Sequence, residues 1–533
     1  MKSRALLLAS GLVIPALTGC ATIGTTGATN APAELRLDMA TFEDKIRGGW
    51  AGQMAGVCYG DPTEFRWRGR IVDAELRWSP DMVKGALDQD DLYVEMTFAE
   101  VMDREGLDAP MSSYGAAFRD SGYKLWHANA AARRHLNNHI DAPLSGHPLF
   151  NMHANDIDFQ IEADFIGMMT PGMPRTAIEL CDRIGRVVNY GDGVYGGMFI
   201  AGMYSAAYFE DDVEKVVRAG AECMPEGSGY RQIIEDTIRI HAEIPDTWTE
   251  CWRRINEKWD KDDSCPEGAL APFNIDARLN GAYIAIGMLY GEGDFTKTID
   301  ISTRCGQDSD CNPSSAAGVI GVIKGYKALD PEWVGGIPAI AGTKFNYTNY
   351  TFDEISASTK KRAVAAAERA GGRIEGDTLV VVPQAPDPPQ AEQWSMGLPE
   401  KIHPHDDPAW TWRGTWETRP YASYYDPGAK ISTSAANEAE LAFTGSGVAI
   451  VGLLEPEQGG MIDIYLDGVR ATRVNGYVTK DTFDRDIWHI YGIEDTRHTV
   501  RIVTLPEADP RSRGNHIRIE FAKTFRPEAH DGQ

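Results

Sequence analysis

Acidic side chains stand close together in several short stretches of this 533-residue sequence. Asp308 and Asp310 are separated by one residue and precede a run of small and apolar residues, and Asp90 and Asp91 are adjacent at the start of a predicted helix. Neighbouring carboxylates repel one another unless a cation or a shared proton relieves the repulsion. Because carboxylate oxygens are hard ligands, the two pairs predict a site for Mg²⁺, Mn²⁺ or Ca²⁺ rather than for a soft metal.

The elements that must position these carboxylates are mainly helical between about residues 40 and 330. Apolar residues recur at three- and four-residue spacing in several stretches, among them 42–60, 90–106 and 281–293. Small residues are frequent in the first of these stretches, which would let another helix approach closely. Two pairs of aspartates that are far apart in sequence can then converge on one or two ions in the core of a helical bundle.

Three motifs resemble those of the ADP-ribosylglycohydrolase family. "GGWAGQMAGVCYGDPTEF", "DQDDLYVEMTFAEVM" and "GQDSDCNPSSAAGVIGVIKGY" occur in the order of the family's GDALGxPxEF, T-D-D-T and G-G-D-T-D-T motifs. The resemblance implies an all-α domain with a binuclear Mg²⁺ centre. It also implies that Asp90, Asp91, Asp308 and Asp310 are metal ligands, and that Glu64 lies beside the metals and the scissile bond.

The chain departs from these motifs at several positions. Gln89 and Leu92 stand where the family has threonines, Cys311 replaces the last threonine of the late motif, and Val57 replaces an aspartate. Gln89 offers an amide oxygen and is included among the predicted metal ligands, whereas Cys311 is a poor ligand for Mg²⁺. Two Mg²⁺ ions, one ion, a larger ion such as Ca²⁺, or no ion therefore remain open alternatives.

The middle of the helical region is rich in acids and differs from the family pattern. The stretch "NDIDFQIEADFIG" is unsuited to a diphosphate, whereas Asn, Asp, Glu and aromatic side chains are typical of sugar sites. Since glycoside hydrolysis uses a pair of carboxyl groups, the predicted catalytic residues are Glu64, Asp158 and Glu162. The predicted substrate-binding residues are Asp156, Asp164, Asn189, Asp192, Tyr195 and Asn312.

Three functions are compatible with these motifs. The favoured one is a metal-assisted glycoside hydrolase that cleaves a furanoside or another neutral glycoside in an extracytoplasmic glycan. The first alternative is an Mg²⁺-dependent ADP-ribosyl hydrolase, and the second is a glycan-binding lipoprotein without catalysis. The net charge of −26 excludes nucleic acid as an expected partner, because phosphate binding needs clustered Lys and Arg.

The N-terminus reads as an export signal. A basic start and a short apolar run lead to "LTGC", which resembles a bacterial lipobox with Cys20 as the lipidated residue. Ala21 follows the cysteine, which favours an outer-membrane lipoprotein facing the periplasm or the cell surface. Residues 21–36 would then be a tether between the membrane and the folded protein.

The C-terminal part changes to an alternating pattern that is typical of strands. It resembles the galactose-binding-like or carbohydrate-binding β-sandwiches, with a jelly-roll-like arrangement, that accompany secreted glycosidases. The predicted order is a signal peptide (1–20), the tether (21–36), a helical catalytic domain (37–383), a Pro-rich linker (384–409) and the sandwich (410–525). Cys305 and Cys311 can pair in an oxidising compartment, and no zinc-type cysteine spacing is present.

Overall fold

The computed structural model describes residues 33–261, 265, 267–420 and 428–528. The predicted signal peptide, Cys20 and residues 21–32 of the predicted tether lie outside the described residues. Within the described part, no helix combines the length and the apolar composition needed to cross a bilayer.

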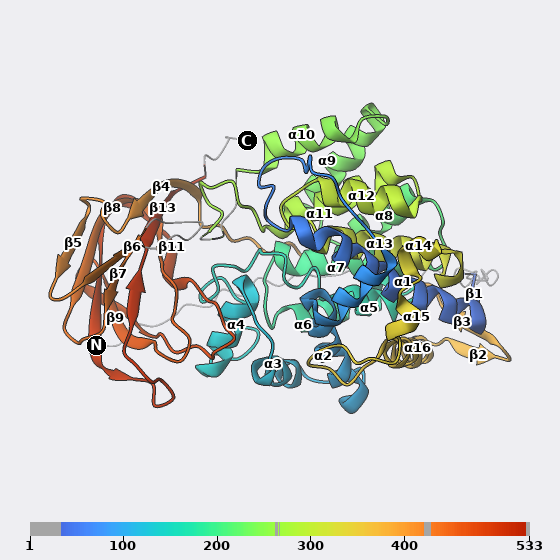
Figure 1. The fold of residues 1–533 in the computed structure, drawn as a ribbon, viewed down its shortest axis with the longest axis horizontal. Helices are drawn as coiled ribbons and strands as arrows, with labels where there is room; N and C mark the ends of the chain where they lie inside the picture. Colours follow the sequence, from blue (N-terminus) through green and yellow to red (C-terminus); the bar gives the residue numbers. More distant parts are fainter. Residues whose placement is uncertain (1–32, 262–264, 266, 421–427, 529–533) are drawn as a thin grey trace, which may run out of the picture. The chain divides into compact units, whose positions relative to one another are not determined.

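Helices dominate the chain from residue 39 to residue 369 (Figure 1). The stretches with helical spacing all form helices, and the family-like motifs lie at the ends of three of them. The helices are α1 (Met39–Gly60), α2 (Asp90–Glu105), α3 (Met111–Asp120), α4 (His127–Asn137), α5 (Asp164–Met168), α6 (Pro174–Gly185), α7 (Asp192–Ala207), α8 (Val213–Glu222), α9 (Gly229–Glu243), α10 (Trp248–Trp259), α11 (Ala277–Gly291), α12 (Phe295–Arg304), α13 (Cys311–Lys324), α14 (Pro331–Val334), α15 (Ile337–Ile340) and α16 (Phe352–Arg369), with short 3-10 turns η1 (Asp61–Thr63), η2 (Pro80–Asp88) and η3 (Tyr326–Ala328).

Helices α1 and α13 pack with their backbones in direct contact. Glycines recur every fourth residue along α1, and a Cβ atom on Gly52 or Gly56 would lie 2.2 Å from a carbonyl oxygen of α13. A Cβ atom on Gly60 would lie 1.9 Å from the Ser309 carbonyl oxygen, in the turn before α13. No side chain fits at these distances, so glycine at these positions allows α1 and α13 to approach closely. The pattern of small residues predicted such an approach.

Strands form a second region after residue 397. One antiparallel sheet has the order β10-β9-β11-β8-β13-β4, with β5 also paired to β8, and a smaller antiparallel sheet has the order β12-β7-β6. Leu441 of β8, Ile502 of β11 and Ile519 of β12 belong to one apolar core, so the two sheets are packed together. The strands are β4 (Leu398–Pro404), β5 (Trp410–Arg413), β6 (Glu417–Pro420), β7 (Gly428–Ser432), β8 (Glu438–Val451), β9 (Gly460–Leu466), β10 (Val469–Asn475), β11 (Asp486–Ala508), β12 (Ile517–Ile519) and β13 (Phe521–Arg526).

Two predicted boundaries differ from the structure. The predicted linker 384–409 contains β4, which pairs with β13 and so belongs to the C-terminal sheet. The Pro residues of this stretch led to the prediction of a linker. They are compatible with a strand here because β4 lies at the edge of the sheet, where Pro is tolerated. At the other end, β1 (Leu35–Asp38) overlaps the predicted tether and pairs with β3 (Thr378–Val381), next to β2 (Arg373–Glu375).

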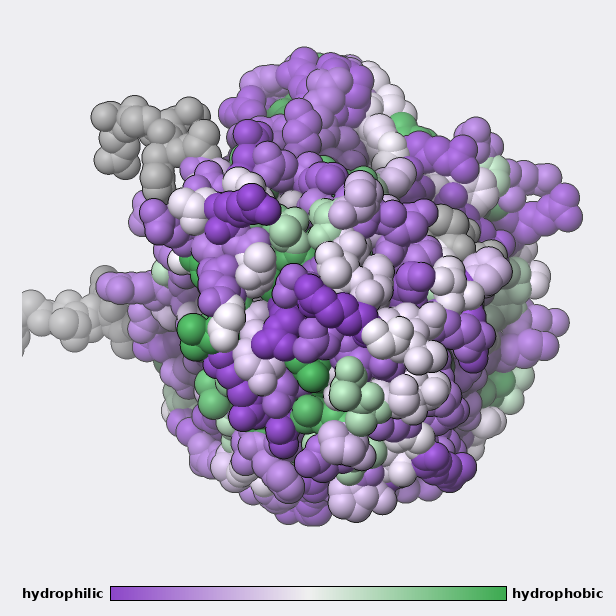
Figure 2. Space-filling view, turned by 90° about the vertical axis from the view of Figure 1, so that its left-hand side faces the viewer, coloured by the Kyte–Doolittle hydropathy of each residue, from purple (hydrophilic) through white to green (hydrophobic). Residues whose placement is uncertain are grey.

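Buried polar contacts join the helical domain to the β-domain, which we define as residues 397–528. Arg134 of α4 forms an ion pair with Asp484 at 2.9 Å, and both side chains are almost fully buried. Main-chain hydrogen bonds of 2.9 Å connect Leu125 with Asp481 and Phe483 with Leu125. The face of the β-domain seen in Figure 2 is mainly hydrophilic, with only small groups of apolar residues.

Candidate active site

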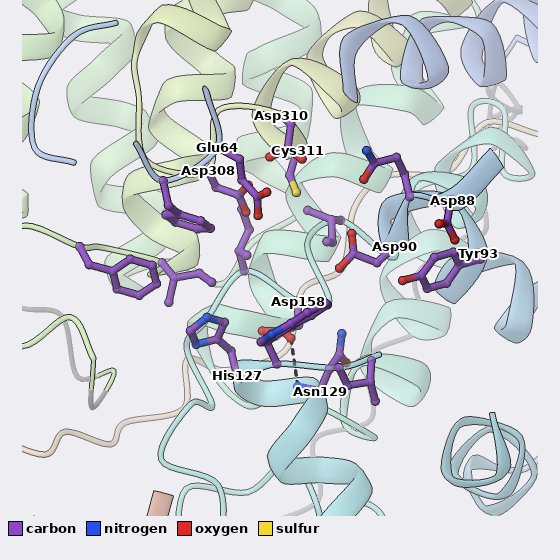
Figure 3. A pocket seen from close by; sticks show the side chains of 18 of the residues that line it. Glu64, Asp88, Asp90, Tyr93, His127, Asn129, Asp158, Asp308, Asp310 and Cys311 are labelled. Carbon is purple, nitrogen blue, oxygen red and sulfur yellow. Dashed lines mark hydrogen bonds between the residues drawn. The ribbon is translucent and has the colours of Figure 1, made fainter. Parts of the chain in front are cut away.

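A pocket of about 360 Å³ opens where the ends of several helical elements meet. Figure 3 shows Glu64, Asp308, Asp310 and Cys311 on one side of it, His127, Asn129 and Asp158 opposite, and Asp90 between the two groups. Other residues that line it are Phe65, Arg68, Asp88, Gln89, Tyr93, Leu125, Trp126, Ile157, Ile161, Phe273 and Ile275.

Two tight turns place Glu64, Asp308 and Asp310 on the same side of the pocket. Glu64 follows the 3-10 turn η1 directly after α1, and Asp310 is the N-cap of α13. The turn into Asp308 passes through Gly306, whose φ of 80° suits glycine and whose missing Cβ would lie 2.5 Å from the Trp67 carbonyl oxygen. The Gln307 carbonyl accepts the Phe65 N–H at 2.9 Å, so the two turns are held together.

The four predicted metal-binding aspartates lie near one another, and ligand atoms of Asp308, Asp310 and Cys311 all lie within 4.8 Å of one another. Burial raises the pKa of Asp308 to about 8, and burial also raises the pKa values of Asp90, Asp91 and Asp310, with the neighbouring carboxylates adding to the effect. One oxygen each of Asp91, Asp308 and Asp310 is buried and has no hydrogen-bond partner among the described residues. Unpaired acceptors at a cluster of negative charge fit a divalent cation.

Gln89 and Cys311 lie beside these aspartates, and their hydrogen bonds show which of their atoms are already engaged. The Gln89 amide N–H donates to Asp61 Oδ1 at 3.0 Å, and Gln89 also lines the pocket. Cys311 Sγ donates to Asp91 Oδ2 at 3.2 Å, and neither Cys311 nor Cys305 forms a disulfide. The disulfide that the sequence left open between these two cysteines is therefore not formed, and the Cys311 thiol points toward the carboxylates.

Glu64 lies at the rim of the pocket and carries a carboxyl group whose pKa is raised in the metal-free protein. The charge of Asp310, burial and the charge of Asp90 together raise the pKa of Glu64 to about 9. Its side chain is exposed to solvent at the pocket, so a proton can be exchanged with a bound molecule or with water. These are the properties of a general acid.

Asp158 faces this group from the opposite wall. One of its oxygens accepts the Asn129 main-chain N–H at 3.0 Å, the other has no partner among the described residues, and burial raises its pKa to about 7. Glu162 is completely buried and does not line the pocket. Its carboxylate accepts the Asn129 side-chain amide at 2.7 Å, so it supports the element that holds Asp158.

The predicted substrate-binding residues do not line this pocket. Asn189 is buried, and its amide bonds to the main chain at Ala154, Asp156 and Phe159. The Tyr195 hydroxyl accepts the Glu392 N–H, and Asn312 bonds to Asn280. The remaining three are also engaged elsewhere: Asp156 with His153, Asp164 with Ser315, and Asp192 with the Tyr230 N–H.

Sequence reasoning did not identify His127 as a site residue. This side chain lines the pocket, and its backbone φ of 48° is unfavourable for a residue with a Cβ atom. Trp126 also lines the pocket and is 43% exposed. A lone His and Trp before an Ala-rich helix gave no chemical signal, since their role depends on where the loop ends.

Comparison with known proteins identifies the helical part. Residues 38–368 match the sequence model of the ADP-ribosylglycohydrolase family, and no curated protein has significant similarity to the chain. A solved "ADP-ribosylglycohydrolase-related protein complex" is similar at 15% identity, covering 61% of this chain and 98% of that one, with a TM-score of 0.38. The β-domain part is similar to a family 35 carbohydrate binding module from Clostridium thermocellum, at 12% identity over 23% of this chain and 95% of that one, with a TM-score of 0.18.

Proposed function

The chain belongs to the ADP-ribosylglycohydrolase family, and we propose that it is a metal-assisted glycoside hydrolase acting on a furanoside or another neutral glycoside of an extracytoplasmic glycan. The observation that carries the proposal is the scarcity of cationic side chains on the pocket wall. Among the described residues that line it, six carboxylates stand beside one arginine, Arg68. A diphosphate needs several cationic groups, whereas carboxylates bind sugar hydroxyls well, so the wall favours a neutral sugar.

The aspartate cluster would hold the cation. Asp90, Asp91, Asp308 and Asp310 supply hard oxygen ligands, and bound Mg²⁺ or Ca²⁺ would supply Lewis-acid polarisation of a sugar hydroxyl oxygen. The raised pKa of Asp308 has a direct consequence, because protons and the cation compete for the same carboxylates. Binding of the cation therefore becomes tighter as pH rises.

Two carboxyl groups on opposite walls would divide the proton transfers. Glu64, when protonated, donates its proton to the leaving-group oxygen as the glycosidic bond breaks. Asp158, when ionised, accepts a proton from the water that adds to the anomeric carbon. The exposed face of Trp126 offers a stacking surface for a sugar ring at the same pocket.

Hydrolysis assays test the proposal directly. Purified protein is offered nitrophenyl furanosides and pyranosides beside ADP-ribosyl-arginine and ADP-ribosyl-serine, with EDTA, Mg²⁺ or Ca²⁺. We expect release of nitrophenol from a glycoside that needs a cation and that is lost in Asp308→Asn. Release of ADP-ribose without glycoside turnover would instead assign the ADP-ribosyl hydrolase activity, and sugar binding without any turnover would assign a binding protein.

We further propose that the protein is anchored through a lipid on Cys20 and faces the periplasm or the cell surface. The support is the lipobox-like "LTGC" after a short apolar run. Metabolic labelling with a radioactive fatty acid tests it, with Cys20→Ser as the comparison. Label that persists in Cys20→Ser would refute anchoring at this residue.

A glycan-binding role is proposed for the β-domain. Trp412 and Trp416 lie with ring centroids 4.9 Å apart, and both are partly accessible. Trp412 is stacked on Trp410, so the accessible ring of Trp416 is the surface that would stack on a sugar. Affinity electrophoresis with neutral polysaccharides tests the role, and retardation that is unchanged in Trp416→Ala would rule out this surface.

A further inference from the structure

A second group of side chains of the kinds that bind metal ions lies beside the pocket, separate from the cluster of Asp90, Asp91, Asp308 and Asp310. It consists of His127, His153, Cys265 and Glu267, and their ligand atoms all lie within 4.8 Å of one another. Three of the four side chains are buried, and His127 reaches the pocket wall. Such a group, two imidazoles with a thiol and a carboxylate, is rarely assembled in a protein interior without a cation.

The distances around Cys265 match those of a tetrahedral metal site. Its Sγ atom lies 3.6 Å from His153 Nδ1, 4.0 Å from His127 Nδ1 and 3.4 Å from Glu267 Oε2. With metal–sulfur bonds of about 2.3 Å and metal–nitrogen or metal–oxygen bonds of about 2.1 Å, tetrahedral angles place such atoms about 3.6 Å apart. A central ion therefore fits with only small movements of the side chains.

Asp156 adds a further acidic group to the same space. Its Oδ2 atom lies 2.7 Å from His153 Nδ1 and 3.7 Å from His127 Nδ1. Its Oδ1 atom is buried and has no hydrogen-bond partner among the described residues. Glu267, the other buried carboxylate, has Arg485 Nε at 3.4 Å. Without an ion, Arg485 and the His153 Nδ1–Asp156 hydrogen bond compensate these carboxylates, and a divalent cation bound to a Cys265 thiolate would take the place of the proton in that bond.

We propose that His127, His153, Cys265 and Glu267 form a binding site for a transition-metal ion of the zinc type. A thiolate with two imidazoles selects zinc or a similar metal over Mg²⁺ and Ca²⁺, which the aspartate cluster prefers. Four protein ligands in a closed setting are typical of a structural ion. The site would join the start of α4 to the segment that carries Phe273 and Ile275, and so fix one wall of the pocket.

Metal analysis of the full-length protein tests this site without relying on activity. Protein that has been loaded with Zn²⁺ and dialysed against excess Mg²⁺ should retain about one zinc ion per chain. Replacement by Co²⁺ should give thiolate-to-cobalt charge-transfer absorption, a signature of the sulfur ligand. Absence of both the retained zinc and the absorption in the wild-type protein would overturn the proposal, and this arm needs no variant.

Variants then locate the ion. We expect Cys265→Ser and His153→Ala to bind Zn²⁺ at least about 10-fold more weakly, whereas Cys251→Ser, at a buried thiol on α10 outside the group, should bind it normally. Asp308→Asn should also keep the zinc, because its carboxylate belongs to the other cluster. Zinc lost in Asp308→Asn and kept in Cys265→Ser would overturn the assignment.

Discussion

The indole of Trp126 stacks on the ring of Phe483, with the ring centroids 5.6 Å apart and the planes inclined by 13°. Trp126 lines the pocket of the helical domain, whereas Phe483 belongs to the β-domain. The β-domain therefore supports a side chain at the pocket itself. Under the proposed stacking of a sugar ring on Trp126, this contact would give the C-terminal domain a direct part in substrate recognition.

Removing the stacking partner should weaken substrate binding. An aromatic pair contributes about 0.5–1.5 kcal/mol beyond its buried area, so Phe483→Ala should raise KM about 2- to 10-fold while kcat changes little. Steady-state kinetics on the active glycoside measure the split. Tyr465→Ala, on the far strand β9, is the matched control and should leave both constants unchanged. An unchanged KM in Phe483→Ala would mean that Trp126 does not contact the substrate.

Loss of a metal ligand should be visible in binding as well as in turnover. Asp308→Asn removes one charged ligand from the cluster and should weaken Mg²⁺ or Ca²⁺ binding by about 10-fold or more. Isothermal titration calorimetry measures the affinity. Asp294→Asn, at an exposed helix N-cap, serves as the control. Equal affinities in the wild-type protein and Asp308→Asn would remove Asp308 from the ligand set.

Thermal stability should depend on pH in a way that reveals the cluster. In the metal-free protein, the pKa values of Asp158 and Asp308 are raised to about 7 and about 8, so the folded state binds protons more tightly than the unfolded state. Their contribution is complete below the unfolded pKa values near 4 and is lost as pH rises through 7 and 8. Tm should therefore fall between about pH 4 and 8 in EDTA, and less steeply in Mg²⁺ or in Asp308→Asn.

Glu64 should be essential for bond cleavage and dispensable for folding. Glu64→Gln removes the proton donor while keeping the shape of the side chain, and loss of a general acid costs about 10²- to 10⁴-fold in rate. We expect kcat to fall by that factor with Tm unchanged near neutral pH, because the raised pKa leaves the Glu64 carboxyl uncharged there, like the amide that replaces it. Turnover of a substrate with an activated nitrophenol leaving group should suffer less than turnover of a natural glycoside. Equal losses for both would argue against an acid role.

The ion pair between the domains should be important for stability. Arg134 and Asp484 are almost fully buried, so Arg134→Ala leaves an unpaired buried carboxylate and should cost about 3–5 kcal/mol. Urea unfolding measures the loss. The double variant Arg134→Met, Asp484→Leu should lose less, since no charge is left unpaired. Arg218→Ala, in an exposed pair with Glu214, should change stability by less than about 1 kcal/mol.

The sequence predicted the helical domain, the change to strands and the paired aspartates, because periodicity and short motifs are local properties. It did not predict which acids of the middle region reach the pocket. Asp158 and Asp156 are two residues apart, yet one lines the pocket and the other binds His153. The group around Cys265 was also missed, since its members come from three separate segments whose spacing matches no zinc motif.

The contact between α1 and α13 sets the distance between Glu64 and the aspartates before α13. Glu64 follows the end of α1, and Asp308 and Asp310 precede the start of α13, so backbone contacts at Gly56 and Gly60 fix where the acid stands relative to the ion ligands. This spacing is independent of the side chains that line the pocket. Under the proposed function, substitutions on the opposite wall at positions other than Asp158 would therefore change which sugar is accepted without moving Glu64 relative to the aspartates, so that one helical scaffold could serve several substrates.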